Sequence, residues 1–316
     1  MEQSNLPLRI RLDKTTKAGE LLRARNCNLS CFWCHGDYFR HKIGIRALSN
    51  KRLIEVVNNV LVASSRPTAE IKISGQGEPC LAGKKELCDL IKSLRSFSRI
   101  STIKLVTNGI LLDEMAQDLV NSGLDGVNVS IHSLKPQRYQ KITGKDKLAQ
   151  AIKGVRAANK VGLKVKLNTI YCRLNEDEIW NFVSFAEKEK VVIKFFGLLC
   201  TNSLCEGLHL PLEKLWKQLE LKATSKKVFE EPYVFYEYHF GSGAIIQVKN
   251  CQINRCPQKG CQCRQKCLEG CRSSVRISAD GILHPCGVRD DNVVSLTDPN
   301  ISKEEIRRAL LSGGKS

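Results

Sequence analysis

Short apolar runs alternate with amphipathic stretches along the first two thirds of this 316-residue sequence. The runs that predict strands lie at residues 21–24, 70–74, 102–107, 126–132, 164–171 and 191–199. Helical patterns lie at residues 50–63, 84–97, 113–122, 148–161 and 176–189, with Asn175 as the expected cap of the last helix. Parallel neighbours need a crossover connection, usually a helix. Six such units in series predict an α/β fold with a parallel sheet, a partial (β/α)6 TIM-like barrel.

The pattern changes after about residue 205. Residues 206–250 contain a helical stretch at 212–221 and an aromatic-rich extended stretch at 233–240. Seven cysteines then crowd into 36 positions: Cys251, Cys256, Cys261, Cys263, Cys267, Cys271 and Cys286. Core packing does not explain so local a density, so we expect metal ligation there. We predict a core barrel at residues 1–205 and a C-terminal cysteine-rich iron–sulfur extension at residues 206–316.

Composition narrows the class of protein. No run of about 18 apolar residues predicts a membrane span, and the N-terminus lacks the basic start and apolar stretch of a signal peptide. We therefore expect a cytoplasmic protein with no membrane partner, in which the 15 cysteines do not form a disulfide framework. The cysteines that are scattered singly are expected to be mostly free and buried: Cys80, Cys88, Cys172, Cys200 and Cys205.

The formal net charge of +18 favours an anionic partner, whether a nucleotide, a nucleic acid or an acidic peptide. The lysines are spread along the chain rather than gathered in blocks. A solvated lysine-rich surface is therefore the alternative interpretation of the charge.

Three cysteines stand close together near the N-terminus, in the run N-C-N-L-S-C-F-W-C-H. Cys27, Cys31 and Cys34, at CxxxCxxC spacing, can ligate three irons of a [4Fe–4S] cluster and leave the fourth iron without a protein ligand. An open iron allows the cluster to bind a small molecule. A zinc site is the alternative, although zinc ligands usually come as two pairs such as CxxC…CxxC.

Other motifs fall at the carboxyl ends of the predicted strands. G-Q-G-E-P (75–79) follows the second strand, T-N-G (107–109) ends the third, and Ser130 and His132 end the fourth. In βα barrels the chemistry lies at this edge, on the loops that follow the strands. The placement predicts a single active-site mouth.

Longer segments carry a family resemblance. They are G-L-D-G-V-N-V-S-I-H-S-L (123–134), Y-Q-K-I-T-G-K-D (139–146), A-A-N-K-V-G-L-K-V-K-L-N-T (157–169), N-E-D-E-I (175–179) and C-R-S-S-V-R-I-S-A-D-G-I-L-H-P-C (271–286). Together with the cysteine run they resemble the GTP 3′,8-cyclases, radical AdoMet (radical SAM) enzymes of molybdenum-cofactor biosynthesis. The resemblance covers roughly residues 21–200 and 263–290. It implies a lyase that cleaves S-adenosylmethionine at the first cluster, with a reducing electron donor.

The resemblance also assigns residues to the first site. Cys27, Cys31 and Cys34 would bind the cluster, and Trp33 would be the aromatic position beside the adenine of AdoMet. Positions that would contact AdoMet are Gly75, Gly77, Glu78, Pro79, Thr107, Asn108, Ser130 and Asn168. Glycines in the first of these segments would let the backbone approach the ligand closely. For Thr107, Asn108 and Gly109 the alternative is a plain turn at a strand end.

A second cluster is implied for the C-terminal part, held by Cys267, Cys271 and Cys286 and facing the substrate's purine. Cys263 is a rival for Cys267, further clusters remain open, and zinc is the alternative metal. Lys166 and Arg276 match basic positions that hold a nucleotide, where arginine offers a planar fork to phosphate. Arg272 lies close to another such position, which is Ser274 here.

Several departures argue against assuming GTP as the substrate. Acidic residues replace two of the family's basic residues, at Glu20 and Glu70, and Ser274 replaces an arginine. A triphosphate needs several cationic partners. The spacing CxxxC in the second motif and the inserted glutamine in G-Q-G-E-P also differ from the family pattern. The Gly313–Gly314 pair near the C-terminus resembles the family's terminal double glycine, although frayed Gly/Ser/Lys tails are common.

We therefore expect a radical AdoMet enzyme that abstracts hydrogen from an anionic small molecule and cyclises or rearranges it, most similar to a GTP 3′,8-cyclase. A peptide-maturing radical AdoMet enzyme with auxiliary clusters is the second interpretation, favoured by the seven C-terminal cysteines. A non-enzymatic, zinc-dependent nucleic-acid-binding protein is a remote third, favoured by the basic charge.

Overall fold

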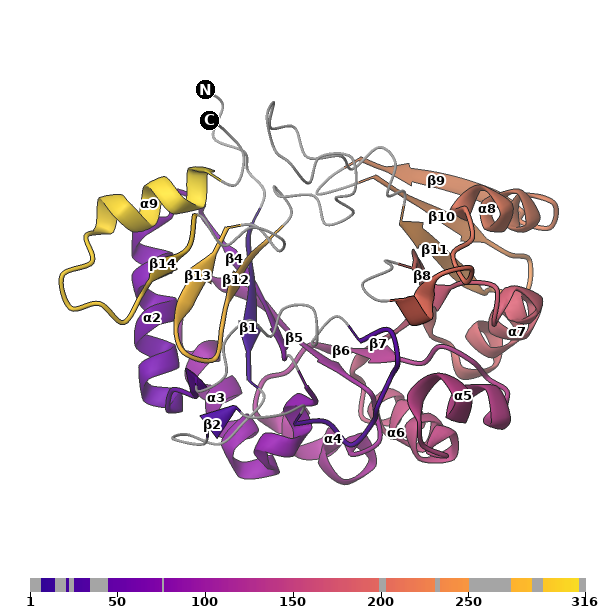
Figure 1. Ribbon diagram of the computed structural model, residues 1–316, viewed down its shortest axis with the longest axis horizontal. Helices are drawn as coiled ribbons and strands as arrows, with labels where there is room; N and C mark the ends of the chain where they lie inside the picture. The colour runs from indigo at the N-terminus through magenta and orange to yellow at the C-terminus, as the bar shows by residue number, and fades with distance from the viewer. Residues whose placement is uncertain are drawn as a thin grey trace.

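A computed structural model describes residues 7–14, 21–22, 26–34, 45–75, 77–198, 203–230, 234–249, 274–285 and 292–312. Its main element is a 12-stranded sheet with the order β14-β13-β12-β1-β4-β5-β6-β7-β8-β11-β10-β9. The sheet curves, and helices cover its outer face (Figure 1). No helix in the described ranges is long and apolar enough to cross a membrane.

The centre of the sheet consists of six parallel strands in chain order. They are β1 (Leu8–Asp13), β4 (Ala69–Ser74), β5 (Ile100–Thr107), β6 (Gly126–Ser130), β7 (Lys164–Tyr171) and β8 (Val192–Gly197). Buried and half-buried positions alternate along β1, β4 and β7 because successive side chains point to opposite faces. The predicted α/β fold with a parallel, partial-barrel sheet is confirmed.

The prediction for the first strand was wrong. Leu21–Leu22 (β2) pairs antiparallel with Ile45–Arg46 (β3) in a separate two-stranded sheet. The first strand of the large sheet is β1, where Leu8, Ile10 and Leu12 are buried beneath the helices. The sequence analysis missed it because arginines alternate with these apolar residues, which interrupts the apolar run that predicts a buried strand.

Five predicted helices are present: α2 (Asn50–Ala63), α3 (Lys84–Arg95), α4 (Leu112–Asn121), α6 (Leu148–Lys160) and α7 (Ile179–Glu189). Their buried faces and the outward-facing strand residues form one large apolar core. Two further helices were not predicted, α5 (Pro136–Thr143) and α9 (Lys303–Ser312), nor were the 3₁₀ turns η1 (Pro79–Ala82) and η3 (Ser203–Cys205). The first turn of the helix predicted at residues 176–189 is the 3₁₀ turn η2 (Glu176–Glu178). Asn175 stands at the expected N-cap position, before η2 and α7, but its side chain makes no capping hydrogen bond.

Residues after 206 extend the same sheet at both edges. The elements are α8 (Leu212–Glu220), β9 (Ser225–Phe229), β10 (Phe235–His239), β11 (Ile245–Lys249), β12 (Val275–Ile277), β13 (Ile282–His284) and β14 (Val294–Ser295). β11 runs parallel to β8, and β12 runs parallel to β1. The division at residue 205 stays a prediction, and most of the cysteine-rich segment, residues 251–273, lies outside the described residues.

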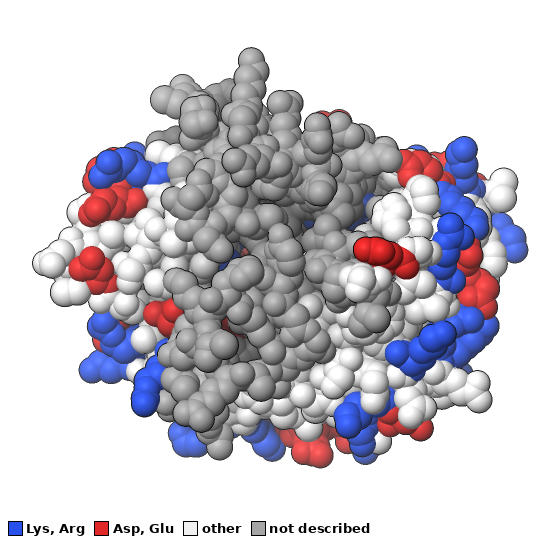
Figure 2. Space-filling model, in the orientation of Figure 1, with Lys and Arg blue, Asp and Glu red and all other residues white. Residues whose placement is uncertain are grey.

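Among the described residues, the basic charge does not form a single patch on the face that Figure 2 shows. Lysines and arginines alternate there with acidic residues around the periphery (Figure 2). Among described residues, the cations that do gather lie on the strands of the barrel.

Candidate active site

The cysteine run forms a loop whose backbone is held by α5. Cys27, Cys31 and Cys34 are all half-buried on this loop. The Ser30 amide donates to the Thr143 carbonyl at 2.8 Å, and the Phe32 amide donates to the Ile142 carbonyl at 3.3 Å. Both carbonyls belong to the last turn of α5, whose final carbonyls have no partner inside the helix. The cysteine loop therefore supplies hydrogen bonds that the end of α5 needs.

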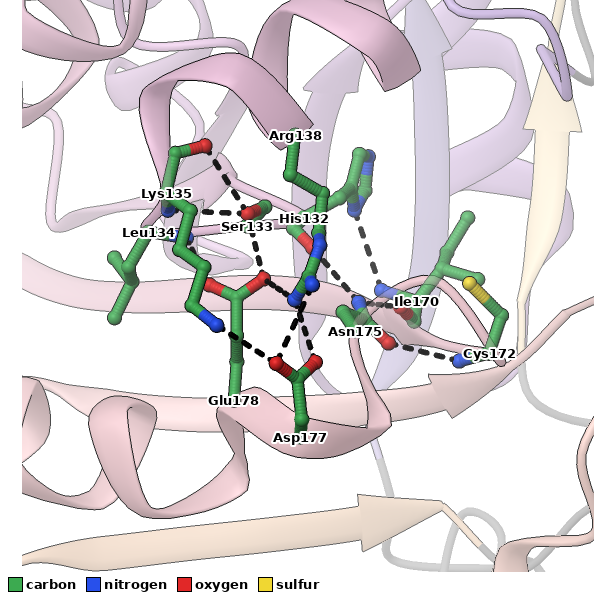
Figure 3. Close-up of polar contacts among 10 residues, drawn as sticks. All are labelled: His132, Ser133, Leu134, Lys135, Arg138, Ile170, Cys172, Asn175, Asp177 and Glu178. Carbon is green, nitrogen blue, oxygen red and sulfur yellow. Dashed lines mark hydrogen bonds and ion pairs between the residues drawn. The ribbon is translucent and has the colours of Figure 1, made fainter.

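A buried acid fixes the other end of α5 (Figure 3). The Glu178 carboxylate is fully buried and accepts from Ser133 Oγ at 2.7 Å, from the Leu134 amide at 2.8 Å and from Arg138 Nη1 at 2.6 Å. Arg138 also donates to Asp177 at 2.6 Å. These bonds join the loop after β6 to the turn after β7, and so hold α5 in place beneath the cysteine loop.

Asp177 and Asn175 complete this network (Figure 3). Hydrogen bonds from Arg138 and Lys135 lower the pKa of Asp177 to about 2. The Asn175 side chain donates to the carbonyls of His132 and Ile170, at 2.7 Å each, and accepts from the Cys172 amide at 2.9 Å. Asn175 thus links two strand ends instead of capping a helix.

The G-Q-G-E-P segment is packed against the residue before Cys27. A Cβ at Gly77 would lie 2.1 Å from the Asn26 carbonyl oxygen, so only glycine fits there. The next amide, that of Glu78, donates to this same oxygen at 2.8 Å. Pro79, buried, begins η1, and Gly75 is exposed. The close approach brings the second strand's loop onto the cysteine loop.

Glu78 ties this loop to the end of β5. Its buried carboxylate accepts from Thr107 Oγ1 at 2.6 Å, from the Asn108 amide at 2.7 Å and from the Cys80 amide at 3.1 Å. Burial raises the pKa of Glu78, and these hydrogen bonds act in the opposite direction. The Glu78 carboxylate and the Thr107 hydroxyl are therefore directed at each other and at the protein backbone.

Asn108 carries the connection on to the cysteines. Its Nδ2 donates to Asn28 Oδ1 at 2.6 Å and lies 3.9 Å from Cys27 Sγ. Burial raises the pKa of the Cys27 thiol, whereas the Leu29 amide, 3.4 Å from the sulfur, and Asn108 lower it. Both donors favour a thiolate, which is the form that binds metal.

Trp33 is buried and is bordered by other rings. Its centroid lies 4.7 Å from Phe32 and 5.4 Å from His132. His132 Nδ1 accepts from the Ile170 amide at 3.2 Å, which assigns the proton of the neutral ring to Nε2. The sequence analysis placed His132 at a strand end but did not propose it as a site residue. Its position, two residues beyond Ser130 on the same side of the chain, could have suggested it.

The inward face of the sheet carries a row of cations. Arg276, Arg11, Lys72 and Lys104 are register partners on β12, β1, β4 and β5, and we call these four residues the cation row. Burial and the positive charges of Arg11, Lys104 and Lys194 lower the pKa of Lys72 to about 7. Only Arg276 of this row was a predicted substrate residue. The others were missed because register between strands cannot be read from the sequence.

Two further lysines face the cation row from β7 and β8. Burial and the charges of Lys194 and Lys104 lower the pKa of Lys166 to about 8. Lys166 Nζ donates to Gln247 Oε1 at 2.8 Å, and Gln247 donates to Glu237 at 2.6 Å. The Lys194 ammonium lies 4.4 Å from the centre of the Phe235 ring. Among the described residues of this side, Glu237 is thus a carboxylate connected to the cations through Gln247.

Some of the remaining predicted residues lie in the part of the chain that the structure describes, and the others lie outside it. Ser130 and Asn168 are register partners on β6 and β7, both half-buried, and Glu70 is paired with Arg9 at 3.1 Å. Ser274 lies next to β12. Outside the described residues lie Glu20, Cys263, Cys267, Cys271, Arg272, Cys286, Gly313 and Gly314.

Comparisons with known proteins agree with this arrangement. Residues 21–186 match the model of the Radical SAM superfamily. A probable GTP 3′,8-cyclase of Methanothermobacter marburgensis is 30% identical over 85% of this chain and 83% of its own length. One of Thermococcus kodakarensis is 28% identical over 91% and 92%. The solved structure of native anSMEcpe with bound AdoMet and Cp18Cys peptide is 14% identical, with a TM-score of 0.63 over 95% of this chain and 80% of that one.

The chain belongs to the radical SAM superfamily and is a radical SAM enzyme. The family implies a [4Fe–4S] cluster and AdoMet, and the residues present fit the cluster. Three half-buried thiols share one loop, and the buried Tyr139 hydroxyl has no hydrogen-bond partner among the described residues. In the described ranges no three His, Cys, Asp or Glu side chains could hold one metal ion. A cluster differs from a single ion because each cysteine ligates its own iron.

Proposed function

We propose that this enzyme acts on an anionic substrate held inside the barrel, and that the substrate is a nucleotide such as GTP. The first cluster and AdoMet, when bound, would supply a 5′-deoxyadenosyl radical for hydrogen abstraction. Cys27, Cys31 and Cys34 would hold the cluster. Asn108 orients the Cys27 sulfur through its amide, and the Glu78 carboxylate fixes the loops that border the site.

The cation row is the observation that most directly supports an anionic substrate. Four cations stand at one level on adjacent strands, with Lys166 and Lys194 facing them. Such crowding is unfavourable in a buried space unless an anion neutralises it. A polyphosphate would accept several charge-assisted hydrogen bonds there. Glu70 stands where the family has a basic residue. This replacement weakens the case for an anionic substrate less than the sequence alone suggests, because Arg9 neutralises Glu70 and the cation row supplies other positive charges.

The match to probable GTP 3′,8-cyclases supports a nucleotide in particular. Reconstituted protein, kept free of oxygen and supplied with a reductant and AdoMet, should release 5′-deoxyadenosine. With GTP it should also give a cyclised product detectable by mass spectrometry. Cys31→Ala should abolish both. AdoMet cleavage without any GTP product would remove the cyclase proposal and leave the radical chemistry standing.

A second cluster at Cys267, Cys271 and Cys286 is part of the same proposal. β12 lies within the motif 271–286 and places Arg276 in the cation row beside β1. Iron and sulfide analysis should give about eight irons per wild-type chain and about four in a triple alanine variant of these cysteines. About four irons in both proteins would contradict a second cluster.

A peptide substrate is the second candidate. The observation in its favour is the seven cysteines between residues 251 and 286, since three suffice for one auxiliary cluster. It predicts more than about eight irons per chain and a precursor peptide encoded nearby. The remote zinc-dependent nucleic-acid-binding interpretation is not supported, because the chain is a radical SAM enzyme.

A further inference from the structure

Tyr139 is a buried tyrosine whose hydroxyl is unsatisfied. The side chain is fully buried, and its oxygen has no hydrogen-bond partner among the described residues. Buried hydroxyls are nearly always paired, because leaving one unpaired costs free energy. The oxygen therefore calls for a partner that the described residues do not provide.

The position of Tyr139 points to the cysteine loop as the place of that partner. Tyr139, Ile142 and Thr143 lie three and four residues apart on the buried face of α5. The last two hold the amides of Phe32 and Ser30, on either side of Cys31. Tyr139 is thus on the helix face that meets the loop, one turn earlier.

Electrostatics agrees with this placement. Burial raises the pKa of the Tyr139 hydroxyl, and the neighbouring groups that raise it further are Cys31, Cys27 and Glu78. Two predicted cluster ligands therefore lie near this oxygen. A tyrosine hydroxyl keeps its proton at neutral pH and can donate it in a hydrogen bond.

We propose that Tyr139 donates a hydrogen bond from its hydroxyl to a sulfur of the first iron–sulfur cluster, either a cysteine sulfur or a sulfide. The inference rests on the proposed function, since it requires a cluster at Cys27, Cys31 and Cys34. Hydrogen bonds to the sulfurs are one of the factors that set a cluster's reduction potential. Tyr139 is then a positioning and tuning residue: it stabilises the reduced cluster, which carries the extra negative charge.

Tyr139→Phe tests the proposal, and Tyr171→Phe is its matched control. Tyr171 is also fully buried, and its hydroxyl also has no partner in the described part of the chain. Its ring packs against Phe195, and the groups that raise its pKa after burial are Glu176 and Cys172, which are not predicted ligands. Both substitutions remove one oxygen from a buried tyrosine, but only the first should affect the cluster.

Three measurements separate the outcomes. Thermal unfolding without iron should show Tyr139→Phe at least as stable as wild type, since no described residue pairs with its hydroxyl. In the reconstituted proteins, the constant for one-electron reduction should fall roughly tenfold in Tyr139→Phe, a shift of about 59 mV to lower potential. After exchange into heavy water, pulsed electron paramagnetic resonance should show one deuteron coupling in wild type and in Tyr171→Phe that is missing in Tyr139→Phe.

An unchanged potential and an unchanged proton coupling in Tyr139→Phe would overturn the proposal, as would equal shifts in both variants. Loss of iron from Tyr139→Phe alone, with its apo fold intact, would support an action of the hydroxyl on the cluster. Wild-type protein that takes up no iron would instead refute the cluster at this site, and with it both the proposed function and this inference.

Discussion

Replacing Lys72 by methionine should stabilise the ligand-free protein. Lys72 lies in the cation row between Arg11 and Lys104, and burial together with these charges lowers its pKa to about 7. Methionine keeps the unbranched shape of the side chain and removes the charge. The substitution therefore relieves a cost of folding, although it removes a partner for the anionic substrate.

The size of this effect depends on pH, and its sign follows from proton binding. Between pH 7 and the ordinary lysine value of 10.5, the unfolded chain binds a proton at Lys72 that the folded chain does not. Stability of the wild type therefore rises with pH in this window. At 1.36 kcal/mol per pH unit, Lys72 costs about 4 kcal/mol at pH 7 and about 2 kcal/mol at pH 9. The gain from methionine should shrink accordingly.

Urea unfolding of ligand-free wild type and Lys72→Met, at pH 7, 8 and 9, measures this difference. We expect the variant to be more stable, with an advantage that falls by about 1 kcal/mol per pH unit. Lys153→Met is the control: Lys153 is 71% exposed and pairs with Asp113, so its effect should stay within about 0.5 kcal/mol at every pH. An advantage for Lys72→Met that does not vary with pH, or a loss of stability at pH 7, would refute the reasoning.

Three further results are expected. Gly77→Ala should destabilise the protein by about 1–3 kcal/mol and slow AdoMet cleavage, because the added Cβ would meet the Asn26 carbonyl. Gly241→Ala is the control and should do neither, because its added Cβ would have its nearest neighbour 3.7 Å away. Glu178→Gln should lower the free energy of unfolding by about 3 kcal/mol, since it leaves the Arg138 charge without its buried partner. Amide hydrogen exchange in the cysteine loop should become faster. Unchanged exchange would contradict the support of that loop by α5. GTP should bind less tightly as the pH rises from 7 to 9, measured by calorimetry, because the inward-facing lysines must be protonated to pair with phosphate; pH-independent binding would count against the cation row as its site.

The sequence was sufficient to predict the parallel sheet and the meeting of its motifs at one edge. The βα alternation determines parallel pairing, and parallel strands bring their carboxyl ends together. The hydrogen bonds that Thr107 donates to Glu78 and Asn108 donates to Asn28 join three of these motifs directly. Local pattern was enough here because each motif directly follows or ends its own strand.

Features that depend on contacts between distant segments could not be predicted in this way. Arg11 and Lys104 belong to one row only because β1 and β5 both flank β4 in a particular register. Arg9 and Arg11 also interrupt the apolar run of β1, which is why the sequence did not predict a buried strand there. Tyr139 is similar, since neither its burial nor its missing partner is visible in the run Y-Q-K-I-T-G.

The hydrogen bonds between α5 and the cysteine loop have a consequence for how the enzyme matures. They join main-chain groups, at Ser30 with Thr143 and at Phe32 with Ile142, and none of them needs a metal. This part of the loop thus takes its shape when the polypeptide folds, which lowers the entropy cost of accepting the cofactor later. A cluster could then be inserted after the chain has folded, and inserted again after it is lost, without refolding of this part of the loop.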